Sequence, residues 1–475
     1  MGIICNDVIH LEREGQDLAF HIPTSALFAL EAAPATLLQM ASVNGDSTAE
    51  ELKHAIIGRG YTEQQFDSAF TELSGLGLII RSEDKHLPSR RLVDLPPKRK
   101  GFSTLVAHVA HTCNLKCSYC YADAGLYGGK AQLMSGETGD QYVDWLFDNS
   151  SAPSLALTFF GGEPLLNWDV VKRMAHRALN RAQSEDRDIR FSMTTNGTLM
   201  TPAIAEQLVA WGVHVTISLD GNKATNDRQR IDHDGRGTYQ RVIAHLEPLL
   251  TAGRAVVRAT LTRDDVDVVN IVEHLMELGF RSVGISPVDT GDGQFDLAPE
   301  DYPVLLDGFT ELAHRYRDEA REGRRFGFQN IEGLLNAFHS GHNKDHPCGA
   351  GIQMLAGGPN GDLHLCHRFM GDTSMKLGTI QTGVPEPEHQ SRLQGLSLDN
   401  RAQCGSCWAR YICGGGCHHA NKVHTGDPRV TKKIHCDWLR AWYRVGLEVY
   451  ADLALARPQH FTDVLGSEPT CVEDP

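Results

Sequence analysis

Three cysteines in the first third of the chain have a spacing suited to iron–sulfur chemistry. Cys113, Cys117 and Cys120 form a CxxxCxxC motif. Iron–sulfur clusters are ligated by cysteine thiolates, usually four of them. Three thiolates at this spacing can hold three irons of a four-iron cluster and leave the fourth iron open, which makes a site for chemistry rather than electron storage alone. A zinc knuckle is the alternative, although zinc sites favour CxxC pairs and four ligands.

A second set of cysteines lies in the last third of the chain. Its members are Cys348, Cys366, Cys404, Cys407, Cys413, Cys417 and Cys436. In a cytosolic enzyme such clustering indicates metal binding or catalysis more often than disulfides. Zinc competes as an interpretation, because a histidine could supply the ligand that seven cysteines lack for two four-ligand sites. The candidates are His364, His367, His418, His419 and His435.

Alternating strands and helices should position the first motif. The predicted strands are residues 104–110, 155–160, 189–195, 213–219, 255–262 and 282–286. Most are continuous apolar or β-branched runs, as in parallel strands that are buried on both faces. Six βα units in series predict an α/β fold with a partial (β/α)6 TIM-like barrel.

Residues that could bind a ligand follow these strands. The first strand runs into the cysteine motif, and later strands run into GGEP, TTNG, SLDG and the segment 287–289. In a parallel barrel these positions share the C-terminal face, where active sites are built. Glycines permit close approach of the backbone, a Glu can accept hydrogen bonds from an ammonium group, and Asn and Ser can bond a sugar or carboxylate. Ordinary turn chemistry is the alternative for Asn and Ser. The charged candidates nearby are Asp220, Arg228 and Arg230.

CxxxCxxC followed by an aromatic residue, then GGEP, TTNG and SLDG in that order, resembles the radical S-adenosylmethionine (SAM) enzymes over roughly residues 103–290. The resemblance implies that the cysteine triad holds a 4Fe–4S cluster whose open iron is chelated by SAM. It implies cleavage of SAM to methionine and a 5′-deoxyadenosyl radical, which abstracts a substrate hydrogen. The residues expected to bind SAM are Gly161, Gly162, Glu163, Asn196, Ser218 and Arg230. The sequence assigns no catalytic base.

The spacing of the C-terminal cysteines resembles the SPASM extension of peptide-modifying radical SAM enzymes. It implies two auxiliary 4Fe–4S clusters, and therefore three clusters in the chain. The distal auxiliary cluster would be held by Cys404, Cys407, Cys413 and Cys436, and the nearer one by Cys348, Cys366 and Cys417. No cysteine lies between Cys348 and Cys366, so we expect an open iron there that binds a substrate cysteine thiolate. Water, His or Asp as the fourth ligand is the alternative. Sulfatase-maturing relatives carry an Asp base after the second auxiliary cysteine, and here His367 replaces it, which argues against formylglycine formation.

Residues 1–95 are predicted to form a separate winged-helix-like domain. Helices are expected to begin near Thr24, Ser47 and Thr62, with a strand at residues 76–81 and a linker at residues 90–100. Such a unit resembles the peptide-recognition element of ribosomal-peptide maturases, which adds a leader peptide as a strand. A scaffold without a ligand is the alternative, and the absence of a basic recognition helix disfavours DNA binding. The other predicted domains are the barrel at residues 101–330, the auxiliary cluster domain at 340–450 and a tail at 451–475.

Length and composition restrict the partners. A chain of 475 residues has room for several domains, and its net charge of −15 disfavours nucleic acid and anionic membranes as partners. No run of about 18 apolar residues is present. The beginning of the chain lacks a basic and then apolar signal pattern, so we expect a reducing cytoplasmic location.

Overall size, layout and the SPASM spacing are similar to the maturase of quinohemoprotein amine dehydrogenase. That family forms thioether bonds between cysteine sulfur and the methylene carbons of Asp or Glu in a small protein substrate. The resemblance implies a cysteine-containing peptide partner and an electron donor such as flavodoxin or ferredoxin. The alternatives are another SPASM maturase, making sulfur-to-α-carbon or carbon–carbon links, and a zinc-stabilised peptide-binding scaffold.

Overall fold

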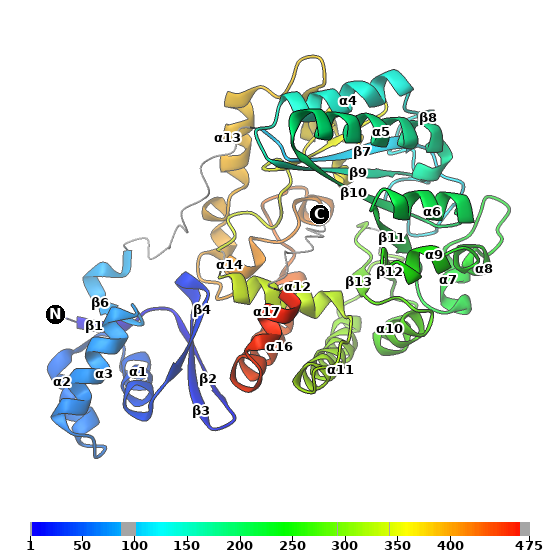
Figure 1. Ribbon diagram of the computed structural model, residues 1–475. Coiled ribbons are helices and arrows are strands. Elements are labelled where there is room, and N and C mark those ends of the chain that lie inside the picture. Colours follow the sequence, from blue (N-terminus) through cyan, green and yellow to red (C-terminus); the bar gives the residue numbers. More distant parts are fainter. Residues whose placement is uncertain (1, 87–100, 292, 342, 466–475) are drawn as a thin grey trace.

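The computed structural model describes residues 2–86, 101–291, 293–341 and 343–465. Figure 1 shows an N-terminal unit beside a large sheet with its covering helices, and C-terminal helices between them. The linker expected at residues 90–100 lies outside the described residues. Within these ranges, no helix combines the length and apolar character needed to cross a membrane.

Six parallel strands form the centre of the largest sheet. They are β7 (Thr104–His111), β9 (Ser154–Gly161), β10 (Asp188–Thr195), β11 (His214–Ser218), β12 (Ala255–Leu261) and β13 (Val283–Pro287). The strands lie side by side in chain order, and each neighbouring pair is parallel. The predicted α/β fold with a mostly parallel sheet is therefore confirmed. The connecting helices are α4 (Gly136–Asp148), α5 (Trp168–Glu185), α6 (Pro202–Ala210), α7 (Lys223–Gln229), α8 (Tyr239–Ile243), α9 (Glu247–Thr251), α10 (Val268–Glu277), α11 (Asp301–Arg321) and α12 (Gln329–Ser340).

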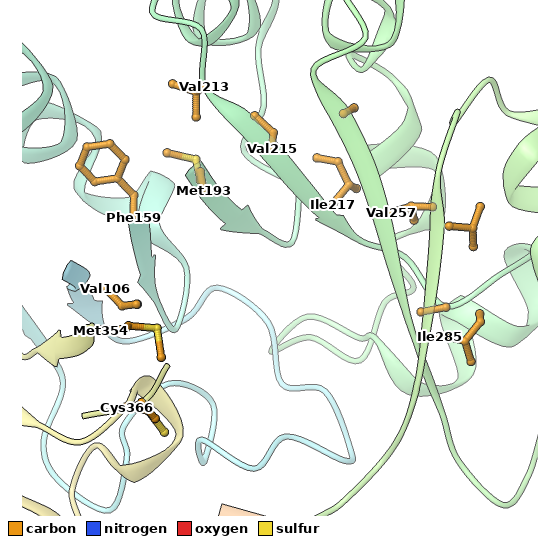
Figure 2. Packing of buried hydrophobic residues seen from close by; sticks show 14 of the residues in the cluster. Val106, Phe159, Met193, Val213, Val215, Ile217, Val257, Ile285, Met354 and Cys366 are labelled. Carbon is orange, nitrogen blue, oxygen red and sulfur yellow. The ribbon is translucent and has the colours of Figure 1, made fainter. Parts of the chain in front are cut away.

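The apolar runs in the sequence predicted strands that are buried on both faces, but the structure shows that β9 to β12 are apolar on one face only. In β9 to β12, buried and half-buried residues alternate. Phe159, Met193 and Val215 belong to the apolar face and join the main hydrophobic cluster (Figure 2). On the alternate positions, the hydroxyls of Thr158 and Ser192 lie 2.8 Å apart. Because side chains alternate between the two faces of a strand, one face of this sheet packs as core while the other keeps polar groups available.

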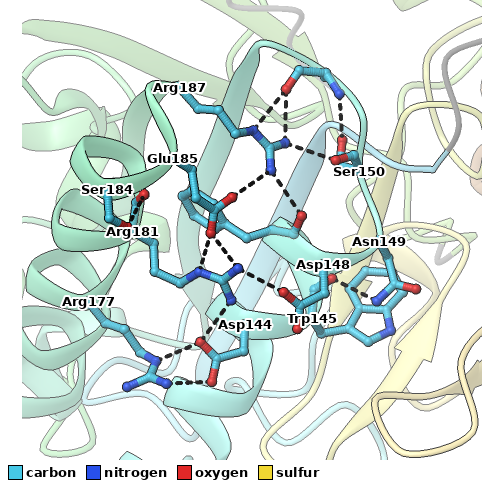
Figure 3. Close-up of polar contacts among 12 residues, drawn as sticks. Asp144, Trp145, Asp148, Asn149, Ser150, Arg177, Arg181, Ser184, Glu185 and Arg187 are labelled. Atoms are coloured by element: carbon cyan, nitrogen blue, oxygen red, sulfur yellow. Dashed lines mark hydrogen bonds and ion pairs between the residues drawn. The ribbon is translucent and has the colours of Figure 1, made fainter.

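An ion-pair network ties two helices that cover the sheet. Arg181 on α5 reaches Asp148 on α4 at 2.7 Å and Asp144 at 3.3 Å (Figure 3). Arg177 pairs with Asp144 at 2.5 Å. These charges are partly exposed, so each pair contributes about 0–1 kcal/mol to stability. The network aligns α4 and α5 more than it stabilises the fold.

The auxiliary region continues the same sheet, which the sequence did not predict. Strand β14 (Met354–Gly357) pairs in parallel with β7, and the antiparallel strands β15 (Asp362–His364) and β16 (Lys376–Thr379) follow. The short strand β8 (Gln132–Leu133) pairs antiparallel with the end of β7. The buried hydroxyl of Tyr142 on α4 donates to the carbonyls of Gly358 (2.9 Å) and Asp362 (2.8 Å). The segment that carries Cys366 is therefore positioned directly by the barrel sheet.

Helices complete the C-terminal part. They are α13 (Glu386–Leu396), α14 (Arg410–Cys413), α15 (His418–Thr425), α16 (Lys433–Ala456) and α17 (Gln459–Leu465). A C-terminal tail was expected from residue 451, but this residue lies within α16. The helix α16 packs on α11 and α12. The buried side chains of Leu447, Val449 and Leu453 carry the apolar face of α16 past the expected boundary, so the helix does not end there.

The N-terminal unit contains three helices and two small sheets. The helices are α1 (Ala32–Asn44), α2 (Ala49–Ile57) and α3 (Glu63–Gly75). One sheet joins β1 (Gly2–Cys5), β5 (Ser47–Thr48) and β6 (Ile79–Arg81), and the other joins β2 (Val8–Arg13), β3 (Gln16–His21) and β4 (Ala26–Leu30). Thr48 and Thr62 begin α2 and α3 with capping boxes, one residue later than expected for α2.

The prediction of a helix that begins near Thr24 is wrong. Residues 26–30 instead form strand β4, which pairs antiparallel with β3. The sheet β2–β3–β4 separates two cores. Leu11, Leu18 and Phe20 belong to the main cluster, whereas Ala19 and Leu30 belong to the N-terminal cluster. Strand pairing that buries both faces of this sheet overrides the helical propensity of its Ala and Leu residues.

Candidate functional site

The CxxxCxxC loop follows β7 and is held by backbone bonds to a second loop. The amides of Lys116 and Ser118 donate to the carbonyls of Ile231 (2.7 Å) and Gln229 (3.0 Å). The imidazole Nε2 of His233 lies 3.0 Å from the carbonyl oxygen of Cys113. These hydrogen bonds from the end of α7 and the segment after it hold the cysteine loop at the ends of the central strands.

The glycines of GGEP pack against the cysteine loop. A Cβ on Gly161 would lie 2.3 Å from the carbonyl oxygen of Ala110, and one on Gly162 would lie 2.2 Å from that of Thr112. Gly161 also has a φ of +134°, which a residue with a side chain rarely adopts. A Cβ on Gly125 would meet the Cα of Gly162 at 2.6 Å. Close backbone approach is therefore required here, and the loop that carries Cys113 is what these glycines approach.

Glu163 is fully buried and is bonded to protein groups. Its carboxylate accepts from the amide of Leu165 (3.0 Å), the hydroxyl of Thr195 (2.7 Å) and the amide of Asn196 (2.7 Å). Burial raises the pKa of Glu163, and these donors oppose that rise. In this geometry Glu163 ties the end of β9 to the end of β10, so we assign it a positioning role. The direct contact with an ammonium group expected from the sequence stays a prediction.

Asn196 contacts the cysteine motif directly. Its Nδ2 lies 3.6 Å from the sulfur of Cys113 and donates to Asn114 Oδ1 at 2.9 Å. Its Oδ1 accepts from the amide and hydroxyl of Thr198 at 2.9 and 2.6 Å. Ser218 ends β11 and is half-buried, on the same sheet edge. The expected SAM-binding residues at the ends of β9 and β10 therefore adjoin the cysteine loop, whereas for Ser218 only its place at the end of β11 is given.

A buried Tyr–Asp–Arg group lies behind the motif. The hydroxyl of Tyr119 donates to Asp220 at 2.5 Å and accepts from Arg230 Nη1 at 2.7 Å, while the Arg230–Asp220 ion pair spans 3.9 Å. Asp220 Oδ1 also accepts from the amide of Thr260 at 3.0 Å. Burial raises the pKa of the Cys117 thiol, and the charge of Arg230 lowers it. Arg230, an expected SAM-binding residue, therefore acts on Cys117, whereas the exposed Arg228 donates to the carbonyl of Asp264 at 3.1 Å.

The nearer auxiliary cysteines come together although they are far apart in the chain. Burial, and then the neighbouring Cys417 and Cys348 thiols, raise the pKa of Cys366 to about 12. Cys366 is buried, whereas Cys417 is exposed. Each comes from a different segment: Cys348 precedes β14, Cys366 follows β15 and Cys417 precedes α15. Cys417 and Cys348, which the resemblance groups with Cys366, therefore lie close enough to act on its thiol.

A second Tyr–Arg–Asp group joins the two cysteine triads. The guanidinium carbon of Arg368 lies 4.9 Å from the ring centroid of Tyr121, the residue after Cys120. Arg368 Nη2 donates to the carbonyl of Asp289 at 3.1 Å. Burial alone would lower the pKa of Arg368, but the adjacent Cys417, Tyr121 and Asp289 raise it. Sequence analysis missed this contact, for which the aromatic residue after Cys120 was the available signal.

The distal cysteines also gather. Burial raises the pKa of Cys404 to about 11, with further rises from the Cys413, Cys407 and Cys436 thiols. The backbone of Gly415 and Gly416 lowers the pKa of Cys413, which burial raises. The four cysteines assigned to the distal cluster therefore surround one place.

The donor sets fit clusters better than single ions. In the described part of the chain, no three cysteine sulfurs lie within 4.8 Å of one another. One zinc ion with bonds of about 2.3 Å would hold its sulfurs about 3.8 Å apart. A four-iron cluster binds one thiolate at each iron and therefore needs wider spacing. Among the described cysteines, no three sulfurs therefore have the compact spacing of a single zinc site.

Four histidines also adjoin the site: three are buried and His111 is half-buried, and sequence analysis singled out only His364 and His367 among them, as zinc candidates. His108, His111, His364 and His367 interact with one another, and burial lowers the pKa of His367 to about 3 and that of His111 to about 4. The ring of Phe160 lies between His108 and His367, at 5.2 and 4.8 Å between centroids. Burial lowers the pKa of each of these histidines and so favours the neutral imidazole, and His367 directly follows Cys366.

Residues 108–293 match the Radical SAM superfamily. This segment begins in β7 and contains the first cysteine motif, GGEP, TTNG and SLDG. A 4Fe–4S cluster and SAM are the cofactors that the family implies. The match covers the part of the fold that positions the first triad.

Known proteins extend the likeness beyond this segment. The radical SAM cyclopropyl synthase TigE of Paramaledivibacter caminithermalis is 30% identical over 194 residues, 37% of this chain and 39% of that protein, so the chain spans well under half the length of this relative. A serine-type anaerobic sulfatase-maturating enzyme of Klebsiella aerogenes is 23% identical over 330 residues, 66% of this chain and 79% of that protein. A solved structure of anSMEcpe with bound AdoMet superposes with a TM-score of 0.67 at 20% identity, covering 77% of this chain and 98% of the other. The radical SAM α/β fold is thereby established, with maturases among its relatives.

Proposed function

We propose that this protein is a radical SAM peptide maturase that forms thioether bonds between cysteine sulfur and Asp or Glu methylene carbons of a small protein substrate. The observation that carries the proposal is the adjacency of two cysteine triads, joined by the contact of Tyr121 with Arg368. One triad suits a cluster that binds SAM, and the other suits a cluster that still accepts a substrate sulfur. A thioether-forming enzyme needs both sites near one substrate.

The bound SAM and cluster would supply a 5′-deoxyadenosyl radical able to take a hydrogen atom from a substrate carbon. The chain's own residues prepare that site. Asn196 contacts Cys113, Glu163 links two strand ends, and Arg230 places positive charge beside Cys117. Cys113, Cys117 and Cys120 would hold the first cluster, and residues at the adjoining ends of β9, β10 and β11 would bind SAM.

The second triad accounts for the sulfur side of the reaction. Three cysteines surround the site, and Cys417 is exposed, so a substrate thiolate has access to it. Formation of the thioether removes one hydrogen from carbon and one proton from sulfur. Cys404, Cys407, Cys413 and Cys436 would hold a distal cluster able to accept the surplus electron, which a flavodoxin- or ferredoxin-like partner would then take up.

A peptide substrate is supported by the relatives and by the N-terminal unit. Three of the similar proteins are sulfatase-maturating enzymes, whose names describe action on another protein. The sheet of β1, β5 and β6 has β5 and β6 as its outer strands, and an extended peptide can bind an outer strand through main-chain hydrogen bonds. We assign leader-peptide recognition to this unit.

Mass spectrometry of a cysteine-containing peptide, co-expressed with the protein, tests the proposal. Each thioether should lower the peptide mass by two hydrogens, with fragmentation placing the bond at an Asp or Glu methylene carbon. A peptide in which Ser replaces the acceptor cysteine is the matched control and should keep its mass. Active SAM cleavage with an unchanged peptide mass would refute the crosslinking proposal. A bond at an α-carbon would assign the protein to another class of maturase.

Metal analysis separates this proposal from a zinc-stabilised scaffold. An anaerobically purified enzyme with three full clusters carries about twelve irons per chain. A colourless protein loaded with zinc at the cysteines, and without SAM cleavage, would refute the radical chemistry altogether.

A further inference from the structure

A compact group of metal-binding side chains lies outside all three cysteine sets. Asp289, His424 and His435 each offer one ligand atom, and these atoms lie within 4.8 Å of one another. All three residues are half-buried. They come from three elements: Asp289 follows β13, His424 is near the end of α15, and His435 is in the first turn of α16. Among the described residues this is the one group with that geometry.

The two imidazoles converge on one carboxylate. His424 Nε2 contacts Asp289 Oδ1 directly, and the rings of His424 and His435 lie 4.9 Å apart in a T-shaped arrangement. The carbonyl of Asp289 accepts from Arg368 Nη2 at 3.1 Å, which fixes the backbone of this residue. A simple His–Asp hydrogen bond would need one imidazole, and here a second is held at the same place.

A second carboxylate completes the surroundings. Asp296 is buried, and its Oδ2 lies 3.8 Å from His424 Nε2. Its oxygens accept from the amide and hydroxyl of Thr290 (3.0 and 2.9 Å) and the amide of Gly291 (2.8 Å), so it is held in place. Two carboxylates and two imidazoles form a donor set that balances the charge of one divalent cation.

We propose that Asp289, His424 and His435 bind one Zn²⁺ ion, with Asp296 or water as the fourth ligand. Imidazole with carboxylate suits zinc, which takes four ligands in a tetrahedral arrangement. Because α15 begins after Cys417 and α16 carries Cys436, the ion would fasten both cluster-bearing helices to the end of β13. The site holds none of the cysteines assigned to clusters, and its role is structural, although Asp289 also contacts Arg368.

Zinc and iron should be counted together on the anaerobically purified, cluster-loaded full chain after incubation with Zn²⁺ and desalting. We expect about one zinc per chain, the content of one four-ligand site. X-ray absorption at the zinc edge should give only nitrogen and oxygen neighbours at about 2.0–2.2 Å. Sulfur neighbours at about 2.3 Å would assign the zinc to the cysteines and overturn the proposal.

Asp289→Asn is the decisive variant because asparagine keeps the shape and a hydrogen-bond acceptor for His424 but is a poorer zinc ligand. The zinc should be lost in Asp289→Asn and in His424→Ala, with the iron content unchanged. His274→Ala is the matched control, since His274 is also half-buried and bonded to one side chain, Tyr239 (2.8 Å), and does not belong to this group. Retention of zinc in Asp289→Asn, or absence of zinc from the unaltered protein, would show that the three residues form a hydrogen-bonded cluster only.

Discussion

Two cysteine triads lie side by side in this protein, and they are assembled in different ways. Cys113, Cys117 and Cys120 come from one loop after β7. Cys348, Cys366 and Cys417 come from three segments, one of which is placed by the pairing of β14 with β7. The first triad depends on local spacing, whereas the second exists only once the sheet has been extended.

Each triad has its own tyrosine, arginine and aspartate. Tyr119, Arg230 and Asp220 lie behind the first, and Tyr121, Arg368 and Asp289 lie beside the second. The two tyrosines flank Cys120 in the chain, so one short loop contacts both arginines. The first arginine pairs with a side-chain carboxylate at 3.9 Å, whereas the second bonds a carbonyl and faces thiols. We infer that Arg230 stabilises the loop and that Arg368 sets the charge between the two sites.

Removing one cysteine from each triad should give the largest contrast. Cys113→Ala should abolish SAM cleavage and crosslinking together, because the first cluster loses a ligand. Cys366→Ala should abolish crosslinking while SAM cleavage continues. Chromatographic assay of 5′-deoxyadenosine and mass spectrometry of the peptide measure the two activities separately. Equal loss of SAM cleavage in both variants would contradict the claim that the two triads have different functions.

Replacing the arginines should give the next largest contrast. Groups that surround a metal site without ligating it typically change activity by about 10- to 100-fold when mutated. Arg230→Met should lower SAM cleavage by that factor, because Tyr119 and Asp220 lose their buried cation. Arg368→Met should lower the number of crosslinks per 5′-deoxyadenosine by a similar factor and leave SAM cleavage near its original rate.

Arg230→Lys and Arg368→Lys are the matched controls for the loss of charge. Lysine keeps the charge without the planar guanidinium, so partial recovery in both is expected. If Arg368→Met impairs SAM cleavage as strongly as Arg230→Met, the two arginines serve one site rather than two.

A smaller effect confined to the first triad is expected from Asn196→Ala. The variant removes the contact with Cys113 and the hydrogen bond to Asn114, each of which is worth about 1 kcal/mol. SAM cleavage below saturation should fall by about 10- to 30-fold, since about 1.4 kcal/mol corresponds to a factor of ten and the two contacts together are worth about 2 kcal/mol. The ratio of crosslinks to 5′-deoxyadenosine, measured in the same reaction, should stay constant. A changed ratio would mean that Asn196 acts on the substrate rather than on the cysteine loop.

The same contrast explains what could be predicted from the sequence. Strand order, the first triad and its neighbouring turns follow from local patterns, because parallel strands bring their C-terminal ends to one edge. The grouping of Cys366 with Cys348 and Cys417 was predicted only by resemblance. The roles of Arg368 and of the strand pairing of β14 could not be predicted, because they depend on contacts between segments more than a hundred residues apart. Glu163 was expected to face a ligand, but its three protein donors come from two strand ends that no local pattern joins.

A variant that weakens the fold away from both triads provides the smallest expected effect on activity. Asp452 on α16 is buried and accepts two hydrogen bonds of 2.7 Å from Arg13 on β2, which joins the N-terminal unit to the main body. Asp452→Asn should lower the free energy of unfolding in urea by about 2 kcal/mol, less than for a fully buried pair because Arg13 is partly exposed. Burial raises the pKa of Asp452, but the hydrogen bonds and charge of Arg13, with Arg317 and Arg321, lower it overall.

A carboxyl group with a lowered pKa stabilises the fold above its ordinary pKa of about 3.9, and that stability is lost as pH falls through the lowered value. The difference between Asp452→Asn and the unaltered chain should therefore be constant from about pH 8 to pH 5. SAM cleavage and crosslinks per 5′-deoxyadenosine should both be unchanged at a temperature where the variant is folded. If crosslinking alone falls, the Arg13–Asp452 contact positions the N-terminal unit for the substrate, and the effects at the second triad can no longer be separated from peptide binding.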